Sequence, residues 1–103
     1  MKEFVISEAK AETAVLVGLI TNEQDEAKTK EYLDELEFLA ETAGITTVKR
    51  FMQKLPSPNS RTYVGPGKLE EIAAWTAENE IDVVIFDDEL SPSQTHNIEK
   101  ALG

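Results

Sequence analysis

Apolar side chains along this chain form two kinds of pattern: short continuous runs, and longer stretches with helical spacing. The runs at Ala14–Ile20 and Val83–Phe86 consist almost entirely of apolar residues, many of them β-branched. Short unbroken runs of this kind are typical of strands buried on both faces of a sheet. They predict two interior strands, near residues 14–20 and 82–87.

The longer stretches predict three amphipathic helices. From about Glu26, apolar residues recur at helical spacing, namely Leu33, Leu36, Ala40 and Ala43. Gly44 follows as a typical residue beyond a helix end. A second helix is expected over about residues 68–79, with an inward face of Leu69, Ile72, Ala73 and Thr76. The third begins after Ser91, where Pro92 and Gln94 complete a capping box, and ends near residue 102.

The remaining segments complete the expected fold. Residues 45–55 have strand composition with mixed alternation, which favours a position at a sheet edge. Residues 1–12 have no clear period, and we expect a loose segment or one extra strand ahead of a domain at residues 13–103. Alternating strands and helices imply an α/β fold of three layers. We expect a small, mostly parallel sheet of about three to four strands flanked by about three helices, and a natural chain that continues beyond the last helix.

Composition narrows the functional class. The chain has 103 residues and no cysteine, which excludes disulfides and thiolate metal sites. Its longest apolar run is far shorter than the ~20 residues of a membrane helix, so no membrane span is expected. The first residues do not have the pattern of a secretory signal. We therefore expect a cytoplasmic protein.

Charge is unevenly distributed. Ten basic and 20 acidic residues give a net charge of −10, yet no acid lies between Thr42 and Leu69. Half of the basic residues lie in that interval: Lys49, Arg50, Lys54, Arg61 and Lys68. Two interpretations stay open. The interval is either a basic strand and loop balanced by acidic helices, or a surface that contacts an anionic partner.

A glycine-rich loop precedes the second helix. Gly65, Gly67 and Lys68 resemble part of a phosphate-binding loop, but Thr62 stands where that motif needs its first glycine and Leu69 where it needs a hydroxyl. The loop is therefore either a structural turn or a weak anion-binding loop at a helix N-terminus.

An acidic cluster follows the second buried strand. Asp87, Asp88 and Glu89 stand just beyond the strand end, where open α/β sheets usually bind ligands. Carboxylates there could hold Mg²⁺ or act as a base. The same residues can equally form a turn that leads into a capped helix. We assign no catalytic residue and no resident metal.

Three stretches together resemble the N-terminal domain of the HflX family of ribosome-associated GTPases. They are Leu36–Gly44, Thr62–Glu71 and Phe86–Gln94. The resemblance implies a non-catalytic domain of a protein that binds the large ribosomal subunit, hydrolyses GTP and splits or recycles ribosomes. In the family, GTP and Mg²⁺ bind a separate downstream domain, joined through a helical segment. The expected partners are thus the large subunit with its rRNA and the protein's own helical and GTPase domains, and no small-molecule substrate is expected.

Two other functions remain as alternatives. An ATP-binding domain would use the Gly65–Lys68 loop with Asp87 and Asp88, and would bind ATP in a magnesium-dependent way. A protein-interaction module would use acidic helix faces such as Glu31, Asp34 and Glu41, and its binding would ignore RNase treatment.

Overall fold

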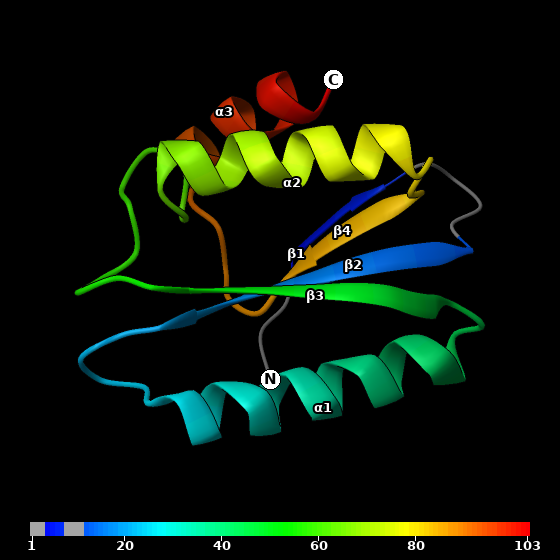
Figure 1. The fold of residues 1–103 in the computed structure, drawn as a ribbon, viewed down its shortest axis with the longest axis horizontal. Coiled ribbons are helices and arrows are strands. Elements are labelled where there is room, and N and C mark those ends of the chain that lie inside the picture. Colours follow the sequence, from blue (N-terminus) through cyan, green and yellow to red (C-terminus); the bar gives the residue numbers. More distant parts are fainter. Residues whose placement is uncertain (1–3, 8–11) are drawn as a thin grey trace.

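The computed structural model describes residues 4–7 and 12–103 of the chain. Its strands are β1 (Phe4–Ser7), β2 (Thr13–Ile20), β3 (Thr46–Lys54) and β4 (Val83–Phe86). Its helices are α1 (Glu26–Thr42), α2 (Pro66–Glu78) and α3 (Pro92–Leu102). Figure 1 shows α1 on one face of the sheet and α2 with α3 on the other, so the expected three-layer α/β fold is confirmed.

The sheet has the order β1-β4-β2-β3. Strand β2 pairs in parallel with both β3 and β4, whereas β1 pairs antiparallel with β4. The chain moves from β2 to β3 in one direction and then crosses back over β2 to reach β4. Crossovers of one handedness that run in opposite directions place their helices on opposite faces, which explains the positions of α1 and α2.

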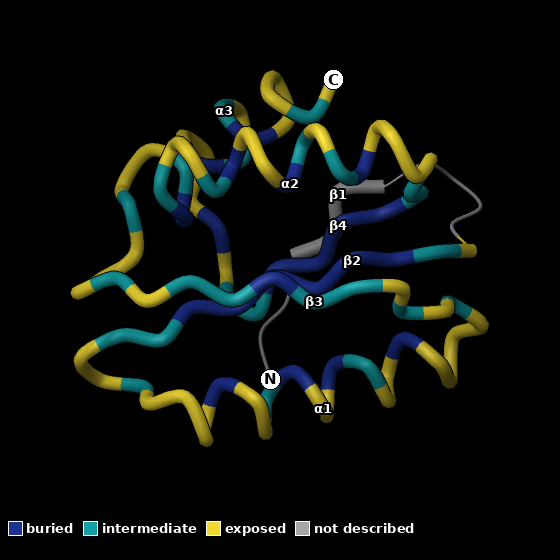
Figure 2. The backbone as a smooth tube through the Cα atoms, viewed as in Figure 1, coloured by how far each residue is buried: buried dark blue, intermediate teal, exposed yellow. Residues whose placement is uncertain are grey.

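Each face of the sheet has its own core, as the buried segments in Figure 2 show. The larger core lies towards α2 and α3 and includes Phe51, Ile72, Phe86 and Ile98. The smaller lies towards α1 and includes Leu16, Leu33, Leu36 and Ile85. Neighbouring residues of β2 alternate between the two cores, which is why this strand has to be apolar on both sides.

Helix ends mostly follow the expected chemistry. Asp25 caps α1 by accepting a hydrogen bond from the Lys28 backbone N–H, at 2.8 Å. Gly44 follows with φ of +82°, a left-handed conformation that side chains disfavour. Ser91 and Gln94 form the full capping box of α3. Helix α2 begins at Pro66, two residues earlier than expected, because a proline at the first helical position needs no hydrogen-bond partner.

The inward face of α1 differs in part from the expected stripe. Leu33, Leu36 and Ala40 are buried, but Ala43 is exposed beyond the last turn and Thr29 is fully buried. The Thr29 hydroxyl donates to the Leu19 carbonyl oxygen at 2.8 Å, which satisfies a buried polar group and ties α1 to β2.

None of the helices in the described part of the chain combines the length and the apolar character that crossing a membrane requires.

Candidate functional site

Loops that follow the carboxyl ends of the three parallel strands meet at one edge of the sheet. They are residues 21–25 after β2, residues 55–65 after β3 and residues 87–91 after β4. The strand order reverses between β2 and β4, so this edge contains the switch point at which open α/β sheets usually bind ligands.

Asp87 lies at this switch point in an unfavourable environment for a carboxylate. Its backbone N–H donates to the Val17 carbonyl oxygen at 2.9 Å, which continues the pairing of β4 with β2. Its Oδ2 atom is buried and has no hydrogen-bond partner. Burial, together with the negative charges of Asp88 and Glu35, raises the pKa of Asp87 to about 6.

Tyr63 packs beside these acids. It is 3 % exposed, and its ring meets that of Phe86 edge-to-face, with centroids 5.6 Å apart. Burial raises the pKa of its phenol, and Asp88 and Asp87 add to the shift. Tyr63 also has φ of +66°, which is rare for a side chain of this size. A paired hairpin with Asn59 holds it there, through N–H to O=C bonds of 2.9 Å in both directions.

The glycine loop before α2 is already partly occupied by the protein itself. The Gly65 backbone N–H donates to Oε1 of Gln53, on β3, at 2.8 Å. The Lys68 ammonium pairs with Glu71 at 3.1 Å, one turn further along α2. An anion at this helix N-terminus would therefore meet Gly67 and a lysine that already has a carboxylate partner.

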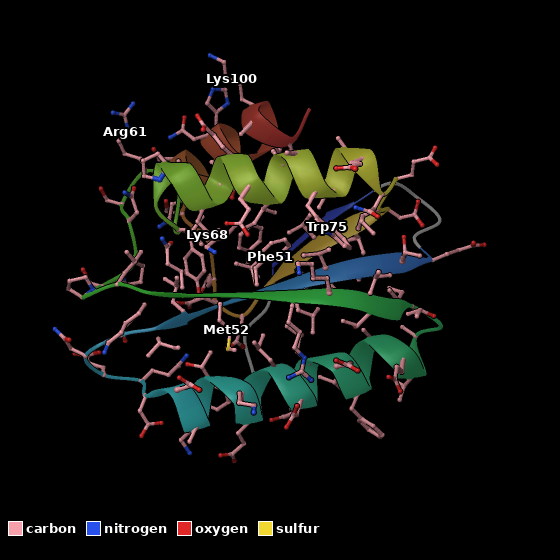
Figure 3. The ribbon with its side chains drawn as sticks, in the orientation of Figure 1. Phe51, Met52, Arg61, Lys68, Trp75 and Lys100 are labelled. Carbon is pink, nitrogen blue, oxygen red and sulfur yellow. The ribbon has the colours of Figure 1, made fainter. Side chains whose placement is uncertain are left out.

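The basic residues of β3 point to opposite faces of the sheet, since side chains alternate along a strand. Arg50 reaches towards α1 and pairs with Asp34 at 2.7 Å and Glu37 at 2.9 Å. Lys49 reaches towards α2, where its ammonium stands 5.2 Å from the centroid of the Phe51 ring and 5.5 Å from that of Trp75. Figure 3 shows these two rings between β3 and α2. The balance by acidic helices that the sequence suggested applies to Arg50.

The other three basic candidates lie in the connection between β3 and α2 or directly next to it. Lys54 ends β3, Arg61 lies in the loop, and Lys68 stands in the first turn of α2. Lys54 and Arg61 are exposed, and Figure 3 shows Arg61 projecting from the α3 side of the domain. The five candidates therefore form no single cluster, but these three share one end of the molecule.

Helix α3 anchors the loop that carries Arg61, a role that the sequence did not reveal. Gln94 Nε2 donates to the Asn59 carbonyl oxygen at 2.7 Å, and Asn97 Nδ2 donates to the Arg61 carbonyl oxygen at 3.0 Å. Asn59 also accepts two backbone hydrogen bonds within the loop. The capping-box spacing predicts that Gln94 caps α3, because that role depends on residues three positions apart. Its hydrogen bond to Asn59 joins distant segments and cannot be predicted from such spacing.

Among the residues that the structure describes, no three His, Cys, Asp or Glu side chains gather as a metal site would require. Asp87, Asp88 and Glu89 stand together at the end of β4, and the Asp88 carboxylate accepts a 2.7 Å hydrogen bond from the Glu89 backbone N–H. This short local bond is typical of the turn that leads from β4 towards α3.

The helices on both faces of the sheet, and the loops at the carboxyl ends of its parallel strands, are those of a small doubly wound α/β domain. The chain belongs to the family described as "GTP-binding GTPase N-terminal", whose model matches residues 30–103. Its relatives include the protein named GTPase HflX in several bacteria. The chain is 54 % identical over 91 residues to that of Flavobacterium psychrophilum and 41 % identical over 92 residues to that of Caldanaerobacter subterraneus. These matches confirm the resemblance to HflX.

The matches cover most of this chain and a small part of each relative. They span 88 % of the chain but 22 % of the Flavobacterium protein, and 89 % of the chain but 21 % of the Caldanaerobacter protein. With GTPase HflX of Escherichia coli the identity is 35 %, over 86 % of the chain and 20 % of the relative. The chain thus spans about a fifth of the length of the curated relatives it matches.

Proposed function

We propose that this chain is the non-catalytic N-terminal domain of a cytoplasmic GTPase of the HflX type. In the whole protein it contributes docking on the large ribosomal subunit and control of the GTPase domain, and GTP with Mg²⁺ binds outside these residues. The family match over residues 30–103 carries the proposal. The splitting or recycling of ribosomes is the function that the family resemblance implies for the whole protein.

The connection between β3 and α2 is the part of the domain best suited to contact rRNA. Arg61 lies in it, Lys54 and Lys68 stand directly before and after it, and the chain has no acid between Thr42 and Leu69. The loop is held to α3 by hydrogen bonds from Gln94 and Asn97, so Arg61 is presented from a fixed backbone. A protein of net charge −10 binds RNA poorly over most of its surface, and a local basic end would therefore orient it.

A charge-reversal experiment tests this docking end. The variant carries Lys54→Glu, Arg61→Glu and Lys68→Glu. The control carries Lys28→Glu, Lys30→Glu and Lys100→Glu, which change the net charge equally at three exposed positions on α1 and α3. Cosedimentation with purified large subunits is measured across a salt series for the whole protein. Each lost phosphate contact should flatten the slope of log affinity against log salt by about one unit.

We expect the first variant to bind more weakly and with a shallower salt slope than the control. Equal slopes and affinities for the two variants would refute docking through this connection. Lys49 and Arg50 are tested as separate single reversals. Arg50→Glu also breaks two ion pairs inside the domain, so its thermal unfolding has to be measured alongside binding.

A further inference from the structure

The outward face of α1 carries apolar side chains that the fold does not use. Among the described residues three large hydrophobic side chains are exposed, and two of them are consecutive on α1: Phe38, 64 % exposed, and Leu39, 43 % exposed. The helix packs on the sheet through its opposite side, where Leu33 and Leu36 are at most 1 % exposed. Burial of α1 therefore depends on other residues, and Phe38 adds little to the stability of the domain.

Acidic residues surround Phe38 on this face. In a helix, residues three, four and seven positions away share a surface with the central residue. Those positions hold Glu31, Asp34, Glu35 and Glu41, all of them exposed. Asp34 pairs with Arg50 yet its side chain stays 69 % exposed. No basic residue follows Lys30 in the helix.

This combination restricts what can cover the face. RNA is repelled by four neighbouring carboxylates, and a second copy of α1 would bring the same charges together. A basic protein segment satisfies both features, because its Lys or Arg side chains pair with the acids while an apolar residue packs on Phe38 and Leu39. A cation can also sit over the exposed ring, as Lys28 does 5.6 Å from the Tyr32 ring centroid on the same helix.

We propose that the face of α1 centred on Phe38 is a docking surface for a Lys/Arg-rich, amphipathic segment of a protein partner. Phe38 is its apolar anchor, and Glu31, Asp34, Glu35 and Glu41 supply its specificity for positive charge. The surface lies on the opposite side of the sheet from α2 and α3, so it is available whether or not the connection between β3 and α2 contacts rRNA. The proposal does not rest on the proposed function.

The test uses this chain and two probes, a short amphipathic lysine–leucine peptide and an oligolysine of the same charge. Affinities are measured by calorimetry, and the contacted residues are mapped by changes in backbone amide NMR shifts. One variant is Phe38→Ala, with Val48→Ala as control, because Val48 is another exposed hydrophobic residue, on the edge strand β3.

The second variant combines Glu31→Gln, Glu35→Gln and Glu41→Gln. Its control combines Glu70→Gln, Glu78→Gln and Glu99→Gln, three exposed acids of α2 and α3.

We expect the amphipathic peptide to bind more tightly than oligolysine and to shift amides of α1. Phe38→Ala should weaken its binding about tenfold or more, as loss of an interface anchor does. The variant that neutralises the three α1 acids should bind the amphipathic peptide more weakly, and its affinity should depend less on the salt concentration. The unfolding temperature of Phe38→Ala should not fall, because alanine favours helix.

Four results would each overturn the proposal. They are equal affinity of the two probes, changes under about twofold in both α1 variants, amide shifts that lie outside α1, and an RNA oligonucleotide that shifts the same α1 amides as the peptide.

Discussion

Asp87→Asn should stabilise the domain at neutral pH. The substitution keeps the shape of the side chain and removes a charge that is held partly out of water beside Asp88 and Glu35. It also replaces a carboxylate whose buried Oδ2 has no hydrogen-bond partner. An unpaired charge in such a place lowers the stability of the folded state.

The size of the effect follows from the pKa. Asp87 titrates at about 6 against an ordinary value of 3.8, and each unit of pKa corresponds to about 1.4 kcal/mol. The two-unit difference sets a ceiling of about 3 kcal/mol. Asp87 is only partly buried, and solvent screening reduces the expected gain to about 1–2 kcal/mol. For a domain of this size that corresponds to roughly 4–8 °C of unfolding temperature per kcal/mol.

The pH dependence has a definite sign. Below pH 3.8 Asp87 is protonated in both the folded and the unfolded chain and has no net effect. Between pH 3.8 and about 6 the folded chain binds more protons, so its stability falls as the pH rises. Above about pH 6 the full cost is present. The gain from Asp87→Asn should therefore be present at pH 7 and above, and disappear at pH 4 and below.

Urea unfolding of the wild type and Asp87→Asn at several pH values measures this gain directly. Glu78→Gln is the control, because it removes an exposed carboxylate from the same acidic protein. If the control is stabilised equally, the gain reflects only the reduced net charge. A gain at pH 7 that persists unchanged at pH 4, or a loss of stability, would refute an unpaired, desolvated Asp87.

Two further substitutions test the packing of α1 on the sheet. Gly18→Ala should lower the free energy of unfolding by about 1–3 kcal/mol, because a Cβ there would lie 3.1 Å from Thr29 Cγ2 and 3.2 Å from Leu33 Cδ1. Urea unfolding should show no such loss for Gly67→Ala, whose Cβ has no neighbour within 4 Å. Arg50→Gln should cost about 1 kcal/mol by removing the pairs with Asp34 and Glu37, and the cost should shrink at high salt. If the loss of unfolding free energy measured in urea does not change with salt, Arg50 stabilises the domain through the packing of its aliphatic stem instead.

Most of the fold could be predicted from local pattern. The strands near residues 14–20 and 82–87, the capping box at Ser91 and the glycine beyond α1 all depend on residues close together in sequence. The start of α2 was predicted two residues late. The helical spacing predicts a start at Lys68 with Pro66 in the turn, whereas Pro66 occupies the first helical position, which suits proline.

The candidate site was predicted less completely. Spacing placed Asp87 and the Gly65 loop after strands, but the neighbours that decide their chemistry come from distant segments. Glu35 of α1 raises the pKa of Asp87, and Asp87 raises that of the loop residue Tyr63, only because folding brings α1, the end of β4 and the loop after β3 together. The sequence leaves the basic interval from Lys49 to Lys68 open as a contact surface or as a strand and loop balanced by acidic helices. Alternation along β3 places Lys49 and Arg50 on opposite faces, and only Arg50 of these two pairs with acids of a helix.

The sequence by itself determined the order and type of the main elements, the family and the uneven distribution of charge. These properties depend on hydrophobic period, cap residues and motifs that are read along the chain. Tertiary structure alone decided which charges are neutralised, which polar groups lack partners and which apolar residues stay exposed. Arg50 is neutralised by acids of α1, the buried Oδ2 of Asp87 has no hydrogen-bond partner, and Phe38 stays exposed. The sheet order and the helix orientation determine these surroundings, and the spacing of the residues along the chain does not.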